Sequence, residues 1–205
     1  MYIKNWLVNQ IAHVSTPTAD SVLLKLKFLP HLTIMGCYIA PGDSQYHSFA
    51  PLAEMKNKMA SSPQEKYLII GDMNARFGDS RRIFLHGKDL PPRIRYRASP
   101  DTVTNPNHNA RYIASSFGPS LVMLNCLSTG HRDMSGDLTF RQGQRWISEL
   151  DLCLLSPEYI ETVEDFAVHQ TPLFPSDHAP ISLKISIVGA RAINHSPPRD
   201  MDEVI

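Results

Sequence analysis

Residues 67–75, Tyr-Leu-Ile-Ile-Gly-Asp-Met-Asn-Ala, place two polar side chains directly after an apolar run. The apolar residues predict a buried strand that ends at Gly71. Asp72 and Asn74 then follow at alternate positions, so in extended backbone both side chains leave the strand on the same face. A carboxylate beside a carboxamide suits a hydrated Mg²⁺ ion, or a water molecule held against a phosphate. An Asx-rich turn after a core strand is the alternative interpretation of this segment.

Two further segments carry side chains that would complement Asp72. Asp177 and His178 precede residues 180–187, in which apolar residues alternate as they do in a strand with one buried face. A histidine is the usual general base near neutral pH, although a lone Asp-His pair is more often part of a surface loop. Asp151 is a single carboxylate within an apolar strand, where its charge is costly unless paired. We therefore expect Asp151 to bind one ring nitrogen of His178 and to fix its orientation.

Two more features suit contact with a phosphate. Residues 32–40 predict a strand that brings Tyr38 to its end, where the phenol hydroxyl could reach a phosphate oxygen; a half-buried sheet tyrosine is the common alternative. Residues 81–97 are basic and contain interleaved aromatic residues, a pattern typical of phosphate-backbone binding. A solvated loop punctuated by proline is the alternative for that stretch. Its basic residues are Arg81, Arg82, Lys88, Arg93, Arg95 and Arg97.

In this order the segments resemble the endonuclease/exonuclease/phosphatase superfamily, and most closely the abasic-endonuclease-like domains of non-LTR retrotransposons. The resemblance extends from about Val22 to Ile187. The motifs that carry it are Tyr38 to Pro41, Gly71 to Gly78, Leu124-Asn125-Cys126, Thr139-Phe140, Ser148 to Asp151 and Ser176 to His178. One departure is Cys126, which stands where the family commonly has glycine.

The resemblance implies a Mg²⁺-dependent phosphodiesterase, with Mn²⁺ as an alternative ion, that hydrolyses DNA as a nicking endonuclease of retroelement type. It also implies a role for each matching residue. These roles are general base or phosphate-polarising group for His178, orienting carboxylate for Asp151, water activation for Asp72 with Asn74 beside it, metal binding for Asp177 and Asp72, phosphate contact for Tyr38, and a nucleotide pocket for Phe140. Apart from these roles, we expect the basic residues after Asp72 to bind DNA, namely Arg76, Arg81 and Arg82.

A second departure concerns the metal. The family's principal metal ligand is a glutamate on a strand before the tyrosine motif, whereas the 37 residues before Tyr38 contain no glutamate. We therefore expect a chain that begins inside the domain and whose activity is weak or lost. Two other functions stay open. One is a non-catalytic remnant or weak nucleic-acid-binding module, and the other is a phosphomonoesterase or small-molecule phosphodiesterase on the same fold.

The composition is that of one α/β domain with a sizeable core, since 42% of its 205 residues are hydrophobic and 20% are charged. Lys and Arg together number 20, as do Asp and Glu, so any basic surface must be local. The three cysteines lie in apolar runs, which is typical of reduced core thiols in an intracellular protein; a nuclear location is open. No apolar stretch approaches the roughly 18 residues of a membrane span. We expect a monomer that binds DNA and no membrane.

The hydrophobic pattern predicts one domain over residues 1–188 and a disordered tail over 189–205. Predicted strands cover 2–8, 22–28, 32–40, 67–71, 121–126, 151–155, 163–168 and 180–187. Predicted helices cover 46–60 and 109–118, and residues 81–108 read as one long loop. The fold class that follows from the pattern and the resemblance is α/β, a four-layer sandwich of two mixed sheets with helices outside and its first strands missing.

Overall fold

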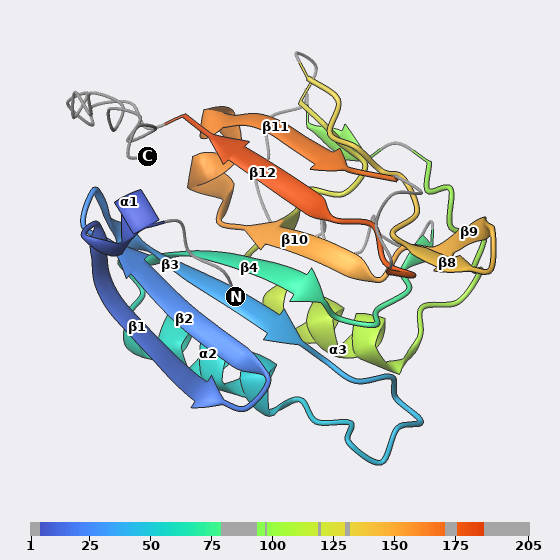
Figure 1. Ribbon diagram of the computed structural model, residues 1–205, viewed down its shortest axis with the longest axis horizontal. Helices are drawn as coiled ribbons and strands as arrows, with labels where there is room; N and C mark the ends of the chain where they lie inside the picture. The colour runs from blue at the N-terminus through green and yellow to red at the C-terminus, as the bar shows by residue number, and fades with distance from the viewer. Residues whose placement is uncertain are drawn as a thin grey trace, which may run out of the picture.

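The computed structural model describes residues 5–78, 94–96, 98–118, 120–129, 132–170 and 176–186. The chain forms a large sheet, three two-stranded sheets and a few helices (Figure 1). The elements are α1 (Asn5–Val8), β1 (Ile11–Thr18), β2 (Ser21–Leu26), β3 (Leu29–Tyr38), α2 (Ala50–Ser61), β4 (Lys66–Asp72), β5 (Arg95–Tyr96), α3 (His108–Phe117), β6 (Val122–Met123), β7 (Leu127–Ser128), β8 (Phe140–Gln142), β9 (Arg145–Ser148), β10 (Asp151–Leu155), η2 (Pro157–Thr162), β11 (Val163–Val168) and β12 (Ile181–Ile185).

The large sheet has six strands in the order β1-β2-β3-β4-β10-β6. Strands β3 and β4 run parallel, whereas the other neighbours in this sheet are antiparallel. Parallel neighbours need a crossover connection, and here the connection contains α2. Because β3 and β4 are parallel, their carboxyl ends meet at one edge of the sheet, which is where such sheets place their ligand chemistry.

Alternation along the central strands produces two hydrophobic cores, one on each face of the sheet. On one face Ile69 and Leu152 pack against α2 and α3. On the other face Leu68 and Cys153 pack with Val163 and Phe166 of the β11–β12 sheet. Helices, six-stranded sheet and second sheet are therefore successive layers (Figure 1). The α/β class and the packing of sheet on sheet confirm the predicted fold class.

Most predicted elements are present with shifted ends. The strands predicted over 151–155 and 163–168 match β10 and β11 as observed. The predicted strand over 2–8 is wrong at residues 5–8, which form the short helix α1. The chain turns there, with the Gln10 amide donating to the Leu7 carbonyl, before it enters β1. Pattern reasoning missed β1 itself, because most of its side chains are exposed on both faces of an edge strand and leave no alternation to detect.

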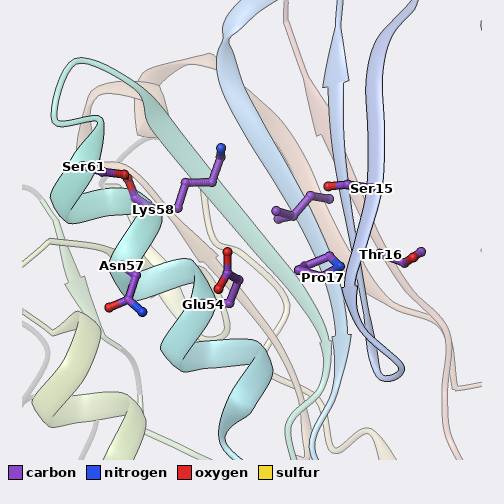
Figure 2. Close-up of a pocket in the computed structure, with 8 residues that line it drawn as sticks. Ser15, Thr16, Pro17, Glu54, Asn57, Lys58 and Ser61 are labelled. Atoms are coloured by element: carbon purple, nitrogen blue, oxygen red, sulfur yellow. The ribbon is translucent and has the colours of Figure 1, made fainter.

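A cleft of about 450 Å³ lies between the β1–β2 hairpin and α2 (Figure 2). None of the predicted site residues lines it. Its lining residues are Ser15, Thr16, Pro17, Leu23, Glu54, Asn57, Lys58 and Ser61. Within the described residues, no helix is long and apolar enough to cross a membrane.

Candidate active site

Three of the predicted site residues form one lateral row across neighbouring strands. Tyr38 of β3 is the register partner of Asp72 of β4, and Asp72 is in turn the partner of Asp151 of β10. Asp72 lies four residues after Leu68 on β4, and Asp151 lies two residues before Cys153 on β10, so each side chain is on the same face as its strand neighbour. Tyr38 shares this face as the register partner of Asp72, and the face is the one toward the second sheet. Cross-strand partners have Cβ atoms about 5 Å apart. The row therefore gathers a phenol and two carboxylates at the end of the sheet where β3 and β4 finish.

Gly71 is required immediately before Asp72. Its φ angle is 149°, and a Cβ atom added at this position would lie 2.0 Å from the carbonyl oxygen of Cys37 on the neighbouring strand. Any side chain here would push β3 and β4 apart at the point where Tyr38 and Asp72 face each other. The glycine thus sets how closely the two strands that carry the row approach.

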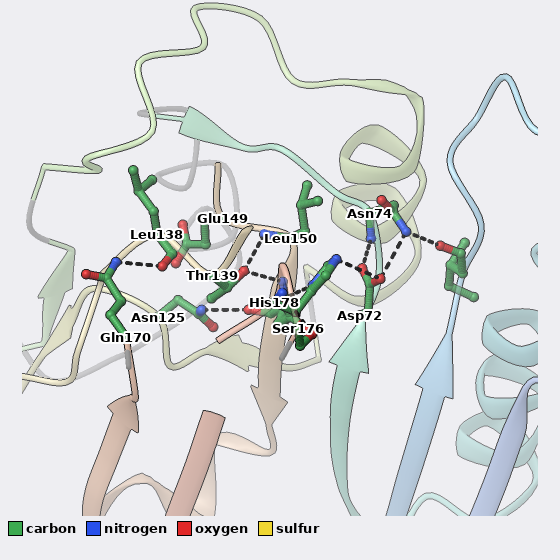
Figure 3. A network of polar contacts seen from close by, with 12 residues as sticks. Asp72, Asn74, Asn125, Leu138, Thr139, Glu149, Leu150, Gln170, Ser176 and His178 are labelled. Atoms are coloured by element: carbon green, nitrogen blue, oxygen red, sulfur yellow. Dashed lines mark hydrogen bonds and ion pairs between the residues drawn. The ribbon is translucent and has the colours of Figure 1, made fainter. Parts of the chain in front are cut away.

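His178 completes the group from a different part of the chain. Its Nδ1 atom lies 2.8 Å from Oδ2 of Asp151, and its Nε2 atom lies 3.9 Å from Oδ2 of Asp72 (Figure 3). The backbone on either side pairs with β8, because the Ala179 amide donates to Thr139 and the Arg141 amide donates to Asp177. The ring of Phe140 lies 5.1 Å from the imidazole. The structure therefore brings together the histidine and the carboxylate that the sequence pairs.

Buried polar side chains hold the backbone around Asp151. The hydroxyl of Thr139, which has no exposed surface, accepts hydrogen bonds from the amides of Leu150 and Asp151 (Figure 3). The side-chain amide of Asn125, also fully buried, donates to the Asp151 carbonyl and accepts from the Cys153 amide. Asn125 thus substitutes for a neighbouring strand beside β10. Both residues lie in motifs of the family resemblance, but nothing in the residues themselves assigned them a role.

Asn74 holds the carboxylate of Asp72. Its backbone amide donates to Oδ1 of Asp72, and its side-chain amide donates both to Oδ2 of Asp72 and to the carbonyl of Ile39 (Figure 3). The Asn74 backbone has a φ angle of 45°, a left-handed conformation that asparagine tolerates better than most residues. The Asx turn and the polar pair that the sequence offered as alternatives are therefore one structure.

The electrostatics of the site are those of two carboxylates around one imidazole. Burial raises the pKa of Asp72 to about 6, and the charge of Asp151 acts in the same direction, whereas the Asn74 amide and the charge of His178 oppose it. Burial lowers the pKa of His178, but the hydrogen bond to Asp151 and the nearby negative charges outweigh that effect and place it above its usual value. Asp72 therefore binds a proton more readily than an ordinary aspartate, and His178 favours its protonated form more than an ordinary histidine does.

The donor set fits a hydrated divalent cation. One ligand atom from each of Asp72, Asp151 and His178 lies within 4.8 Å of the others. The Nδ1 atom of His178 is bound to Asp151, so the carboxylate oxygens of the two aspartates are the natural ligands, and water molecules would fill the remaining positions. A cation there would also relieve the repulsion that raises the pKa of Asp72. No glutamate among the described residues joins this cluster.

The remaining predicted residues are not part of the Asp72, Asp151 and His178 cluster or lie outside the described residues. Asp177 is exposed beside His178 and is not part of the cluster of ligand atoms. Arg76 is half-buried, and its Nε and Nη2 atoms bind the buried carboxylate of Asp101 at 3.1 and 2.6 Å, so its proposed contact with DNA stays a prediction. That ion pair is linked to the site, because Asp101 also accepts from the amide of Glu149. Arg81 and Arg82 lie outside the described residues.

Sequence reasoning missed two asparagines of α3. Asn107 caps the helix by accepting from the Ala110 amide, and its side chain also donates to the carbonyl of Asn74. Asn109 is fully buried and contacts the chain just after β3 and β4. An Asn-x-Asn sequence at a predicted helix start was a visible signal for the cap at Asn107. Nothing local to Asn109 indicates its partners, which are about 36 and 69 residues away.

Neither a protein-family model nor a curated protein matches this sequence. Among solved structures, the 3′–5′ exonuclease NExo from Neisseria meningitidis is 16% identical, with a TM-score of 0.54 over 85% of this chain and 70% of that chain. The 3′ phosphatase NExo from Neisseria bound to a product DNA hairpin is 15% identical, with a TM-score of 0.56 over 86% and 71%. An AP endonuclease from Archaeoglobus fulgidus is 16% identical, with a TM-score of 0.53 over 85% and 71%.

At these identities the likeness concerns the fold. The three similar proteins are nucleases or phosphatases by name, and each is matched over most of this chain. The sequence motifs and the arrangement of layers agree with that likeness. This chain therefore has the fold of the endonuclease/exonuclease/phosphatase superfamily.

Proposed function

We propose that this chain is a metal-dependent phosphodiesterase that cleaves DNA, a nicking endonuclease of the retroelement type. One observation carries the proposal. Tyr38, Asp72 and Asp151 form a single row at the strand ends, with His178 bound to Asp151. A phenol, two carboxylates and an oriented imidazole at one open edge are the groups that phosphoryl chemistry uses.

The geometry assigns His178 a defined orientation. In neutral imidazole its Nδ1–H donates to Asp151, which leaves Nε2 directed toward Asp72. The 3.9 Å between Nε2 and Oδ2 of Asp72 is too long for a direct hydrogen bond. A water molecule or a phosphate oxygen could therefore lie within hydrogen-bond distance of both groups. When protonated, His178 would polarise a phosphate oxygen through the same atom.

Asp72 is well placed to orient or deprotonate the attacking water. In the metal-free chain, burial raises the pKa of Asp72 to about 6, so the carboxylate is a stronger base than an ordinary aspartate and is still ionised at neutral pH. A cation bound to Asp72 would lower that pKa, and the carboxylate would then orient the water rather than deprotonate it. Asn74 holds both carboxylate oxygens and so fixes the direction of the remaining lone pairs. Bound at the two aspartates, Mg²⁺ or Mn²⁺ would stabilise the charge that develops on the phosphate oxygens.

Substrate contacts are expected on either side of this group. Tyr38 is 46% exposed, so its hydroxyl can reach a phosphate that lies over the row. Phe140 stands next to the imidazole and could pack against a sugar or base of the bound strand. We further propose that Asp177, beside His178, and the arginines at 81 and 82 contact the metal and the DNA backbone, respectively. A monomeric state and a nuclear location remain predictions.

A phosphomonoesterase acting on DNA ends is the second candidate. Its support is the similar structure named as a 3′ phosphatase with a product DNA hairpin. Both reactions need the same oriented histidine, so the site geometry alone favours neither. Because no described glutamate joins the aspartates, we expect weak metal affinity and slow turnover in either case.

The test is nicking of supercoiled plasmid with Mg²⁺, with Mn²⁺ and with a chelator, by the wild type and two histidine variants. His178→Gln removes the proposed catalytic imidazole. The matched control is His169→Gln, since His169 is exposed and its ring binds Ser182 rather than a residue of the site. We expect metal-dependent nicking that falls by roughly 100-fold or more in His178→Gln and is unchanged in the control.

Nicking that survives in His178→Gln at the wild-type rate would overturn the proposal, because the activity would then come from elsewhere or from a contaminant. Absence of nicking in every sample calls for the same comparison on an oligonucleotide with a 3′ phosphate. Phosphate release that depends on His178 would support the second candidate. DNA binding without either reaction would identify a non-catalytic binding module.

A further inference from the structure

The backbone ladder between β3 and β4 stops at the candidate active site. Its last rung is the hydrogen bond from the Ile39 amide to the Asp72 carbonyl, at 2.9 Å. Beyond this rung, where the two segments leave the ladder, the carbonyls of Ala40 and Met73 accept from a side chain of α3, while the Met73 amide still donates to the Leu150 carbonyl beside β10. Small changes in the separation of the two segments would move Tyr38 and Asp72, which face each other one residue earlier.

Two side chains join the departing segments. Asn74 donates from its side-chain amide to the Ile39 carbonyl, and Asn109 bonds one residue further along each segment. The amide nitrogen of Asn109, on the first turn of α3, donates to the carbonyl of Ala40 at 3.2 Å and to the carbonyl of Met73 at 2.9 Å. Asn109 is fully buried, so both donors of its amide group are used in the interior. The amide group thus takes the place of the next rung of the ladder.

The remaining atom of the Asn109 side chain is also engaged. Its Oδ1 atom lies 3.0 Å from Nε2 of His47, which comes from the loop after β3. The His47 ring is in turn held edge-on by Phe49, whose ring stacks on Tyr112 of α3 at 3.8 Å. The orientation of the amide group is therefore fixed from three directions, by two backbone carbonyls and one imidazole.

We propose that Asn109 is a positioning residue for the candidate active site, and that it sets the distance between Tyr38 and Asp72 by clamping the ends of β3 and β4. His47 fixes the direction of the clamp. The inference rests on the proposed function for its catalytic consequence, although the clamp itself is a property of the fold. It differs from ordinary helix packing, because the contacts that matter are three hydrogen bonds rather than apolar area.

The experiment compares Asn109→Ala and Asn109→Ser with Thr33→Val. Thr33 is as buried as Asn109 and lies on β3, one of the two strands that the clamp joins. Its hydroxyl donates a hydrogen bond to Glu65, at the opposite end of the sheet from the site. All three variants lose buried hydrogen bonds, so each lowers stability, but only the Asn109 variants release the clamp. Asn109→Ser retains a small donor and provides a second variant if the alanine variant does not fold.

Amide hydrogen exchange measures how firmly the ends of β3 and β4 are held together, and it does not require enzymatic activity. We expect the Ile39 amide to exchange at least about tenfold faster in the Asn109 variants and at the wild-type rate in Thr33→Val, since local openings report local free energies. Wild-type protection of Ile39 in a folded Asn109 variant would overturn the clamp, whatever the activity. If the wild type cleaves no DNA, only the proposed function fails. The exchange result still shows whether Asn109 holds the strand ends together.

Turnover supplies the readout that a purely structural role would not move. At saturating plasmid, we expect the Asn109 variants to nick up to about 100-fold more slowly with a similar KM, because misplacing reacting groups by about 1 Å has effects of that size. His47→Gln should retain near wild-type turnover, since its amide nitrogen can replace Nε2, whereas His47→Leu should not. Equal turnover of the glutamine and leucine variants would remove His47 from the clamp.

Discussion

Strand β4 has a carboxylate at each end, and the two have opposite environments. Glu65, directly before the strand, binds Lys25 and accepts a hydrogen bond from Thr33. Partial burial raises the pKa of Glu65, but the two hydrogen bonds and the charge of Lys25 outweigh it and bring it below the usual value. At the other end, burial and a second carboxylate raise the pKa of Asp72 to about 6.

The contrast separates a carboxylate whose ionisation stabilises the fold from one whose ionisation costs stability. Glu65 faces a cation, so ionisation of its carboxylate strengthens the fold. Asp72 faces Asp151, so its ionised form is less favourable in the folded chain than in the unfolded one. A fold tolerates such a site when other interactions compensate, and unfavourable electrostatics concentrate where chemistry is performed. The comparison predicts that substitutions at the two ends have opposite consequences.

The largest effect is expected for Asp151→Asn. The amide would no longer hold His178 in the tautomer that leaves Nε2 available, so the nicking rate should fall by roughly 10³-fold or more while the chain stays folded. Plasmid nicking measures this, with Asp165→Asn as the control, because Asp165 is an exposed aspartate of β11. Retention of wild-type nicking in Asp151→Asn would show that the pair with His178 is structural.

Gly71→Ala should cause the largest loss of stability. Its Cβ would lie 2.0 Å from a backbone carbonyl that cannot move without opening the sheet, and φ is positive. We expect the free energy of unfolding to fall by about 3 kcal/mol or more. Gly36→Ala is the matched control on the adjacent strand, where a Cβ meets nothing within 4 Å. Denaturant titration of both variants measures the difference. Similar losses would mean that β3 and β4 are packed no more closely at Gly71 than at Gly36.

The sequence predicted which side chains gather at this site better than it predicted the residues that hold them in place. Asp72, Asp151 and His178 could be named because polar residues at the ends of apolar strands violate the local pattern. Their pairing followed from the chemical needs of a histidine. By contrast, Thr139 and Asn109 act through backbone groups of distant segments, so their roles depend on contacts that only the fold creates.

The dependence on contacts between distant segments also explains why the sequence did not predict the partner of Arg76 or the edge strand β1. DNA binding by Arg76 stays a prediction, whereas its ion pair with the buried Asp101, 25 residues away, could not be predicted from the sequence. Strand β1 has no alternation to detect, since one edge of it lacks a neighbour in the described sheet. Long buried strands were predictable from periodicity, whereas short strands such as β8 and β9 form because a hairpin fits beside His178.

Asp72→Asn should gain stability relative to the wild type as the pH rises, whereas loss of a paired buried charge usually lowers stability. The pKa of Asp72 is raised in the folded chain, so its contribution to stability is present below about pH 4 and is lost as the pH rises through about 6. Between pH 4 and pH 8 the stability of the variant should therefore improve relative to the wild type by on the order of 2 kcal/mol. Denaturant titration with a chelator at several pH values measures this difference, and a gap that does not change with pH contradicts the raised pKa.

Glu65→Gln gives the smallest effect and the opposite pH dependence. The pKa of Glu65 is lowered in the folded chain, so its contribution is present above the unfolded value and is lost as the pH falls through the folded one. Because solvent screens this partly exposed pair, we expect the variant to be about 0.5–1 kcal/mol less stable at pH 7. The gap should close in acid and shrink in high salt. Denaturant titration of both variants across the same pH range would then show stability differences that move in opposite directions at the two ends of β4. A gap at Glu65 that widened in acid would mean that the pKa of Glu65 is raised rather than lowered in the folded chain, and the two carboxylates would then respond to pH in the same direction.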